Sequence, residues 1–225
     1  MEGQERAIEW TEQGVPVSRR FDDPYYSMAG GLEETRHVFL RGNSLPERFR
    51  RGEPHHVAEL GFGTGLTLAV MRAAYRELKR DQPIQFSSFE AFPMPVPDMR
   101  AALRAFPEIS AEIDDVLDAL AEGRTKFSAP DLTFELILGD ARETLPQWDG
   151  RANSWCLDGF SPAKNPELWD PKLMHCVARH TAPKGRFATY TAAGHVRRAL
   201  AAAGFEVSRA PGFGRKRHMS VGYLL

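Results

Sequence analysis

The sequence is poor in the features that mark several common classes of protein. It has two cysteines in 225 residues, Cys156 and Cys176, too few for a disulfide framework, and the first lies in an apolar run where we expect a buried thiol. It has no Cys/His cluster with the spacing of a metal site, so we expect no metal. No apolar run approaches the ~18 residues of a membrane span, and the charged N-terminus has no apolar signal region. These absences predict a soluble, cytoplasmic protein.

The net charge and the composition further limit the class of protein. A formal net charge of −1 argues against a protein covered by nucleic acid over its whole surface, although it leaves room for local basic patches. A hydrophobic content of 42% over 225 residues is enough for one globular domain with a sizeable core.

A glycine-rich turn near residue 60 is the most informative motif. The segment His55–Gly65 predicts a strand that ends near Glu59, then a turn with Gly61, Gly63 and Gly65, and then a helix. Units of this kind hold nucleotide-like cofactors, because glycine reaches positive φ and leaves no Cβ in the way of a ligand. The spacing is not the G-x-G-x-x-G of dinucleotide sites, and no Gly-Lys-Ser/Thr follows. An acid before the glycines suits a ligand with a cationic amino-acid end, which favours S-adenosylmethionine.

Beyond this turn, short apolar runs alternate with helical stretches, which predicts an α/β fold with a mostly parallel sheet. Seven strands are expected at Val57–Leu60, Gln85–Phe89, Thr133–Leu138, Ser154–Leu157, Arg186–Tyr190, Glu206–Ser208 and His218–Tyr223. Helices are expected near 66–79, 97–105, 109–121, 167–179 and 195–203. The loop between the last two strands is too short for a crossover helix, so they should pair antiparallel. Residues 1–50 are expected to form an irregular extension packed on the main domain, 51–225.

Acids recur where the first four predicted strands end, at Glu59, Glu90, Asp140 and Asp158. Ligands of open α/β sheets bind beyond these strand ends, so the four acids should gather at one site. Glu90 could accept hydrogen bonds from a ribose diol, and Asp140 with the Ala141 amide could bind adenine. Glu59 could order the glycine loop or meet the methionine amino group. The alternatives are solvated strand ends for Glu59 and Glu90, and a helix N-cap for Asp140.

The fourth strand end combines Asp158, Gly159 and Phe160. A carboxylate there could align an amine for attack on a sulfonium methyl group and accept its proton. An aromatic ring beside it could stack on a base. A structural Asp-Gly turn is the alternative.

Basic residues occur in short clusters that, in general, form a solvated face. The loop Gly212–His218 differs, because it combines glycines, Phe213 and three cations, a composition suited to an RNA backbone and stacked bases.

Segments along nearly the whole chain resemble the methyltransferase domain of the MnmC family of tRNA 5-methylaminomethyl-2-thiouridine biosynthesis proteins, and its stand-alone counterpart, MnmD. The matching segments include Pro16–Arg19, Tyr25–Ser27, Gly31–Arg36, Gly61–Leu66, Ser88–Glu90, Leu157–Pro166, Thr191–Gly194 and Gly212–Arg217. The resemblance implies a class I S-adenosylmethionine-dependent methyltransferase, with a Rossmann-like, mostly parallel seven-stranded sheet and an antiparallel edge strand. It implies methylation of the primary amine of 5-aminomethyl-(2-thio)uridine at the tRNA wobble position.

The resemblance also assigns roles to residues. The catalytic residues would be Asp158, which orients the amine, and Phe160, which packs against the base. The cofactor would be held by Glu59, Gly61, Phe62, Gly63, Thr64, Gly65, Glu90, Asp140, Ala141 and Asp158. The tRNA would be contacted by Tyr25, Lys164, Arg197, Arg198, Arg215, Lys216 and Arg217. The segment Asp22–Tyr26 would fold over the site as part of its wall, or, as the alternative, its tyrosines would anchor it in the core.

Bifunctional members of this family continue into an FAD-dependent domain, which these 225 residues do not include. We therefore expect a functional link to a separate FAD-dependent oxidoreductase or to other wobble-uridine modification enzymes. Three other functions stay open: a methyltransferase of small-molecule amines, a non-catalytic protein that binds RNA or a partner, and, least favoured by the glycine spacing, a dinucleotide oxidoreductase.

Overall fold

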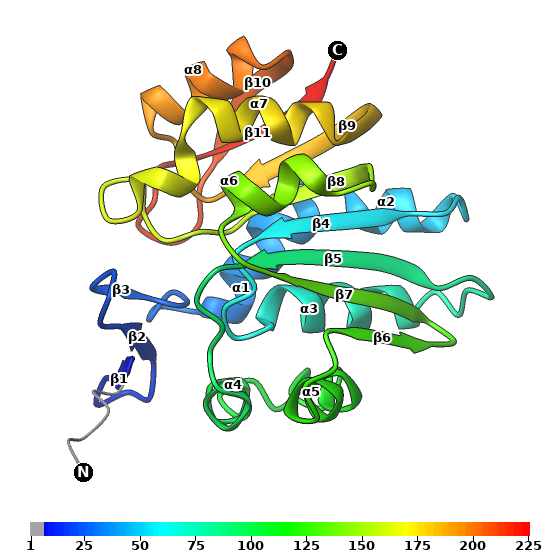
Figure 1. Ribbon diagram of the computed structural model, residues 1–225, viewed down its shortest axis with the longest axis vertical. Coiled ribbons are helices and arrows are strands. Elements are labelled where there is room, and N and C mark those ends of the chain that lie inside the picture. The colour runs from blue at the N-terminus through cyan, green and yellow to red at the C-terminus, as the bar shows by residue number, and fades with distance from the viewer. Residues whose placement is uncertain (1–6) are drawn as a thin grey trace.

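The computed structural model describes residues 7–225, so residues 1–6 of the predicted extension lie outside the described part. Its centre is an eight-stranded sheet in the order β10-β11-β9-β8-β4-β5-β7-β6 (Figure 1). The strands are β4 (His56–Leu60), β5 (Ile84–Glu90), β6 (Lys126–Ala129), β7 (Leu132–Leu138), β8 (Ala152–Leu157), β9 (Thr181–Thr189), β10 (Phe205–Pro211) and β11 (His218–Leu224).

The middle of the sheet is parallel. Strand β4 pairs in parallel with β5 on one side and with β8 on the other, while β7 and β9 extend the parallel part outward. The chain therefore leaves β4 on one side and later returns on the other, which creates the switch point where ligands of such sheets bind. Strands β10 and β11 pair antiparallel, as their short loop predicts. The predicted fold class is confirmed.

The central sheet has eight strands instead of the predicted seven, and the additional strand is β6. This short edge strand forms an antiparallel hairpin with β7, and its side chains are exposed or half-buried. Since its face is not buried, it lacks the apolar alternation that reveals a strand.

Other boundaries also differ from prediction, and the helix expected over 109–121 begins only at Asp114. Strand β9 begins at Thr181 instead of Arg186, and its pairing with β8 shifts register around Pro183 and Gly185, so the predicted turn is an irregularity within the strand. The helix predicted over 167–179 begins later, because Asp170 precedes a proline, which disfavours helical ψ. A single 3₁₀ turn, η3 (Pro166–Trp169), occupies the preceding residues.

Helices cover both faces of the sheet and create two cores. Along β5, Ile84 and Phe86 face one core and Phe89 the other, and along β8 Cys156 and Trp155 divide in the same way. The first core is closed by α3 (Leu66–Arg76), α4 (Val96–Leu103) and α5 (Asp114–Ala121); the second by α6 (Ala141–Thr144), η2 (Leu145–Gln147), α7 (Pro171–Arg179) and α8 (Gly194–Ala202).

The N-terminal region is more regular than predicted. A small sheet of β1 (Ile8–Trp10), β2 (Pro16–Ser18) and β3 (Asp23–Pro24) lies across from the carboxyl ends of the central strands (Figure 1). It is followed by α1 (Gly31–Thr35), the π-helical turn η1 (Arg36–Arg41) and α2 (Leu45–Arg50). Leu32, Phe39 and Phe49 from these helices belong to the core of α3. The division of the chain at residue 50 stays a prediction.

Among the described residues, no helix combines the length and apolarity of a membrane span. In the same part of the chain, no three His, Cys, Asp or Glu side chains come together as a candidate metal site. Both Cys156 and Cys176 are free and buried, as predicted for the first.

A buried arginine joins three elements of the first core. The side chain of Arg72 in α3 is 1% exposed, and it binds Asp115 of α5 at 2.5 Å and Asp131 of the β6–β7 turn at 2.8 Å. Two guanidinium nitrogens reach each carboxylate, which fixes the relative positions of the three elements.

We predict that Arg72→Met lowers the free energy of unfolding by about 2–4 kcal/mol, because two carboxylates lose their buried partner. Urea denaturation monitored by circular dichroism measures the change. The control, Arg124→Met at an exposed pair, should change it by less than about 0.5 kcal/mol. Equal effects of both substitutions would contradict a structural role for Arg72.

Candidate cofactor and acceptor site

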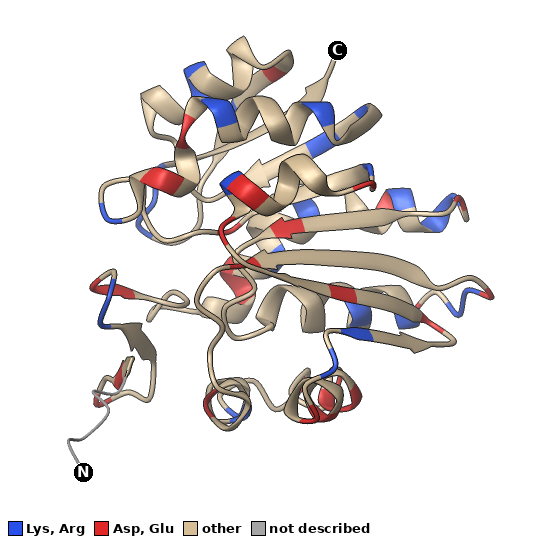
Figure 2. Ribbon diagram, viewed as in Figure 1, with Lys and Arg blue, Asp and Glu red and all other residues tan. Residues whose placement is uncertain are grey.

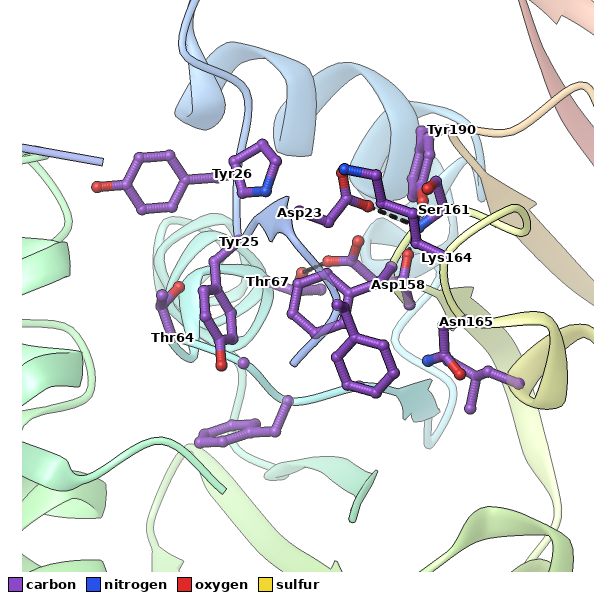
Figure 3. A pocket seen from close by; sticks show the side chains of 18 of the residues that line it. Asp23, Tyr25, Tyr26, Thr64, Thr67, Asp158, Ser161, Lys164, Asn165 and Tyr190 are labelled. Atoms are coloured by element: carbon purple, nitrogen blue, oxygen red, sulfur yellow. Dashed lines mark hydrogen bonds between the residues drawn. The ribbon is translucent and has the colours of Figure 1, made fainter. Parts of the chain in front are cut away.

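A cavity of about 1150 Å³ lies at the carboxyl ends of the central strands. The glycine loop, the ends of β5 and β8, residues 20–29 and the loop 213–216 line it. We call residues 20–29 the N-terminal strap. Figure 3 shows Asp158 near the middle of this cavity, with Tyr190 and Ser161 on one side and Tyr25 and Thr64 on the other.

The glycine loop follows β4 and cannot carry side chains at its bends. Gly61, Gly63 and Gly65 have φ of 91°, 53° and 80°. A Cβ on Gly61 would lie 2.4 Å from the carbonyl oxygen of Asp158. The loop and the end of β8 therefore approach each other more closely than any residue except glycine permits.

Glu90, the last residue of β5, holds this loop from the other side. Its Oε2 accepts a hydrogen bond from the Gly63 amide at 3.1 Å, and its Oε1 accepts one from the Phe92 amide at 2.8 Å. Each carboxylate oxygen has a further lone pair. Glu90 lines the cavity and can still accept hydrogen bonds from a diol.

Asp140 is the N-cap of α6. It accepts a hydrogen bond from the Arg142 amide at 2.8 Å, and the Arg142 guanidinium lies 2.6 Å from its Oδ2. These bonds from Arg142 hold the pKa of Asp140 below its usual value. Both Asp140 and Ala141 line the cavity. The N-cap alternative is confirmed, and it leaves room for a ligand contact.

Two of the predicted cofactor residues, Gly65 and Glu59, do not line the cavity. Glu59 is 1% exposed and accepts a hydrogen bond from the Ser88 hydroxyl at 2.7 Å. Its Oε1 has no hydrogen-bond partner among the described residues. Burial, and then the nearby Asp158, raise the pKa of Glu59 well above its usual value. The alternative of a solvated strand end is therefore wrong for Glu59.

Asp158 follows β8 and points into the cavity. The Thr67 hydroxyl in α3 donates a hydrogen bond to its Oδ2 at 3.2 Å. Burial is the largest of the effects that raise the pKa of Asp158 to about 7, with Glu34 raising it further and Thr67 and Lys216 opposing. Near neutral pH this carboxylate can therefore both accept and release a proton.

An aromatic wall stands beside Asp158. Phe160 stacks on Phe21 of the strap, with ring centroids 4.7 Å apart, and meets the Tyr25 ring edge-on at 5.1 Å. The Tyr25 ring also lies against Gly63, so it borders the glycine loop as well as Phe160. Burial, and then the charge of Glu90, raise the pKa of Tyr25 to about 12, so it stays a neutral phenol.

The strap is bonded to the loop after β8. Asp23 accepts a hydrogen bond from the Ser161 amide at 2.8 Å, and Lys164 binds the Asp22 carboxylate at 2.9 Å. The segment Asp22–Tyr26, apart from its first residue, forms part of the cavity wall.

The basic residues predicted to contact tRNA fall into two groups. Lys164, Arg215 and Lys216 line the cavity. Arg197, Arg198 and Arg217 lie outside its wall. Figure 2 shows Lys and Arg spread over several elements, including α2, α7 and α8.

Thr67, Glu34 and Tyr190 are polar side chains of this site that were not predicted, and Asp23 was predicted only as part of the wall segment Asp22–Tyr26. Thr67 binds Asp158, Asp23 holds the strap, and Tyr190 donates to the Gly159 carbonyl at 2.7 Å. Glu34 lines the cavity from α1. No sequence pattern predicts that these residues belong to the site, because each comes from a different element and only the fold brings them close to Asp158.

The donor and acceptor set fits S-adenosylmethionine. A glycine loop without side chains can accept an amino-acid end, Glu90 can bind a ribose diol, and Asp140 with the Ala141 amide can bind adenine. The fold and this site define a nucleotide-cofactor-binding α/β protein with an acidic acceptor pocket.

The comparisons identify the family. Residues 106–224 match the family described as S-adenosyl-L-methionine-dependent methyltransferase, and the chain belongs to this family. Its cofactor is therefore S-adenosylmethionine, as predicted.

Curated relatives are longer than this chain. It is 41% identical over 230 residues to the "tRNA 5-methylaminomethyl-2-thiouridine biosynthesis bifunctional protein MnmC" of Stutzerimonas stutzeri, covering 98% of the chain and 35% of that protein. It is 44% identical over 228 residues to the protein of the same name from Pseudomonas paraeruginosa, covering 96% and 34%. The chain thus spans about a third of the length of these relatives.

A solved structure agrees with this assignment. The "Crystal structure of MNMC2 from Aquifex Aeolicus" matches with a TM-score of 0.79 and 26% identity, over 99% of this chain and 72% of that one. The predicted resemblance to the MnmC methyltransferase domain is confirmed.

We predict that Asp158→Asn raises the melting temperature at pH 8. The folded-state pKa of about 7 exceeds the ordinary 3.8, so the ionised carboxylate destabilises the fold, increasingly as pH rises from 3.8 to 7. The melting temperature should rise by about 2–4 °C for each kcal/mol by which the substitution removes this destabilisation, and the rise should vanish near pH 4. Scanning calorimetry at both pH values measures it. Asp118→Asn on the exposed side of α5 is the control, and an equal gain at both pH values would refute the assignment.

Proposed function

We propose that this chain transfers a methyl group from S-adenosylmethionine to the primary amine of 5-aminomethyl-(2-thio)uridine at the wobble position of tRNA, giving the 5-methylaminomethyl form. The observation that carries the proposal is Asp158, an enclosed carboxylate with a pKa near 7, directly beside the aromatic wall of the cofactor cavity. The names of the relatives, which concern 5-methylaminomethyl-2-thiouridine in tRNA, support this choice of substrate.

Asp158 would orient and deprotonate the amine. S-adenosylmethionine supplies, when bound, a methyl group on a positively charged sulfur that leaves as a neutral thioether. An amine attacks only through a free lone pair, so its ammonium form must first lose a proton. Asp158 accepts the N–H hydrogen bond and takes up that proton, and a pKa near the working pH suits a general base. Thr67 holds the carboxylate in place by its hydrogen bond.

The aromatic residues would position the base. Phe160, backed by Phe21 and Tyr25, offers a rigid ring surface beside Asp158. Stacking of a uracil on such a surface would bring its 5-substituent to the carboxylate and exclude water from the reacting groups.

Basic residues at the cavity mouth support an RNA substrate over a small-molecule amine. Arg20, Lys164 and Arg215 all line the cavity, and the Arg20 guanidinium lies 4.1 Å from the centre of the Phe92 ring. A simple amine has no phosphate group for these cations to bind. Phosphates and stacked bases would be attracted to this combination of cations and rings.

The proposal has consequences for partners and location. The aminomethyl group must be supplied by an earlier reaction, for which an FAD-dependent oxidoreductase activity or another wobble-uridine modification enzyme is the expected source. A tRNA substrate implies a cytoplasmic enzyme.

The first test is transfer of labelled methyl to tRNA that carries 5-aminomethyluridine, followed by nucleoside analysis. We expect 5-methylaminomethyluridine from the wild type and none from Asp158→Ala. Cofactor affinity of the variant should stay within about twofold, because most cofactor contacts lie on other strands. Tight cofactor binding without label in the RNA would refute the proposed substrate, and small amines would then be screened.

A second prediction concerns the loop between β10 and β11. Arg215 and Arg217 are exposed, and replacing both by Gln should lower the slope of log affinity against log salt by about 1–2, since each phosphate contact releases a counterion. Filter binding of tRNA from low to physiological salt measures the slope. Arg51→Gln, in the segment between α2 and the amino end of β4 and outside the cavity wall, is the control. An unchanged slope in the double variant would remove this loop from the RNA footprint.

A further inference from the structure

A second carboxylate faces the acceptor end of the cavity. Glu34 belongs to α1, yet its side chain is only 11% exposed and lines the cavity instead of lying on the outer face of the helix. Its neighbour Glu33 shows the contrast, since that side chain is exposed and binds Arg36 at 2.6 Å. A buried carboxylate needs a cation or hydrogen-bond donors. The partner of Glu34 therefore shows which kind of group this position can bind.

The partner of Glu34 is a primary ammonium group. Lys216 Nζ lies 2.7 Å from Glu34 Oε1 and 4.3 Å from the centre of the Tyr190 ring. A carboxylate and an aromatic face together form a favourable site for an organic cation. The Lys216 side chain is 45% exposed, so it can leave this position without unfolding the core.

The same position adjoins Asp158. The Tyr190 hydroxyl donates to the carbonyl of Gly159, the residue after Asp158. Asp23, Glu34, Asp158 and Tyr190 all line the cavity. Burial is the main cause that raises the pKa of Asp158, and the charge of Glu34 raises it further while Lys216 lowers it. Burial, and then the charges of Asp158, Asp23 and Glu34, raise the pKa of Tyr190.

We propose that Glu34 and the face of Tyr190 form the subsite for the cationic amine of the acceptor, and that Lys216 fills this subsite in the free protein. The lysine side chain and the aminomethyl group both end in a CH₂–NH₃⁺, so each can take the same place. When the acceptor enters, its ammonium group replaces the ammonium group of Lys216. A cation therefore remains near Asp158 throughout. The inference rests on the proposed function, because it requires an acceptor that carries an amine.

Glu34 is then a specificity-determining residue. It would hold the substrate as an ammonium ion before Asp158 takes up the proton, and it would discriminate against a neutral acceptor, which cannot take the place of the Lys216 ammonium beside Glu34. Lys216, in this assignment, competes with the substrate and makes no phosphate contact.

The experiment compares two anticodon stem-loop RNAs that differ in one group, 5-aminomethyluridine or 5-hydroxymethyluridine at the wobble position. Their affinities are measured by calorimetry with S-adenosylhomocysteine bound, so that no turnover occurs. The wild type should bind the amine about tenfold or more tightly than the alcohol, as a charged hydrogen bond permits. Glu34→Gln should reduce this ratio to about twofold or less, and Glu34→Asp should restore part of it. The control Glu33→Gln should leave the ratio unchanged.

Lys216→Met gives the complementary arm. If the lysine fills the amine subsite, its removal should increase the ratio and leave the affinity for the alcohol RNA unchanged. If it contacts phosphate, both RNAs should bind more weakly and the salt slope should fall by about 1. The second result, or an unchanged ratio in Glu34→Gln, would overturn the inference.

Failure of the inference can be told from failure of the proposed function. Methyl transfer by the wild type to the aminomethyl RNA reports the function alone, whatever the ratio in the variants. Thermal melting of Glu34→Gln and Glu34→Asp shows whether each is folded at the temperature of the titration. A folded Glu34→Gln that retains the full preference for the amine would refute the subsite even if the wild type is an active enzyme.

Discussion

The site depends on the contact between Gly61 and the backbone of Asp158. The Asp158 amide donates to the Leu60 carbonyl at 3.1 Å, and the Asp158 carbonyl occupies the space where a Cβ of residue 61 would lie. This contact fixes the distance between the loop that can accept the cofactor and the carboxylate that can accept a proton. Because both belong to neighbouring parallel strands, the sheet itself sets the geometry of transfer.

Three buried or partly buried acids with few hydrogen-bonding partners lie near the same contact. Glu59, Asp158 and Glu34 are acids in partly or fully buried positions, and only a few donors stabilise them: Ser88 for the first, Thr67 for the second and Lys216 for the third. Elsewhere in the described chain, as at Arg72, acids meet arginines in paired geometry. An excess of negative charge in the pocket attracts a cationic ligand. The same excess charge lowers the stability of the folded protein.

The sequence predicted the sheet and its acidic edge well, because strand burial and strand ends are local signals. Glu90, Asp140 and Asp158 lie at one cavity, as their positions after apolar runs indicate. Edge strand β6 and the shift within β9 were missed, since pairing partners decide both. Glu34 and Tyr190 could not be found, because they approach Asp158 from elements distant in sequence, and their burial depends on how α1 and β9 pack.

The hydrogen bond and the ion pair between the strap and the loop after β8 fix these two segments relative to each other. Asp22 and Asp23, adjacent in the chain, are joined to Lys164 and Ser161, on the loop that begins at Asp158. A displacement of the strap would therefore also displace the loop that carries Asp158. Binding energy gained at the strap can in this way contribute to the position of the Asp158 carboxylate.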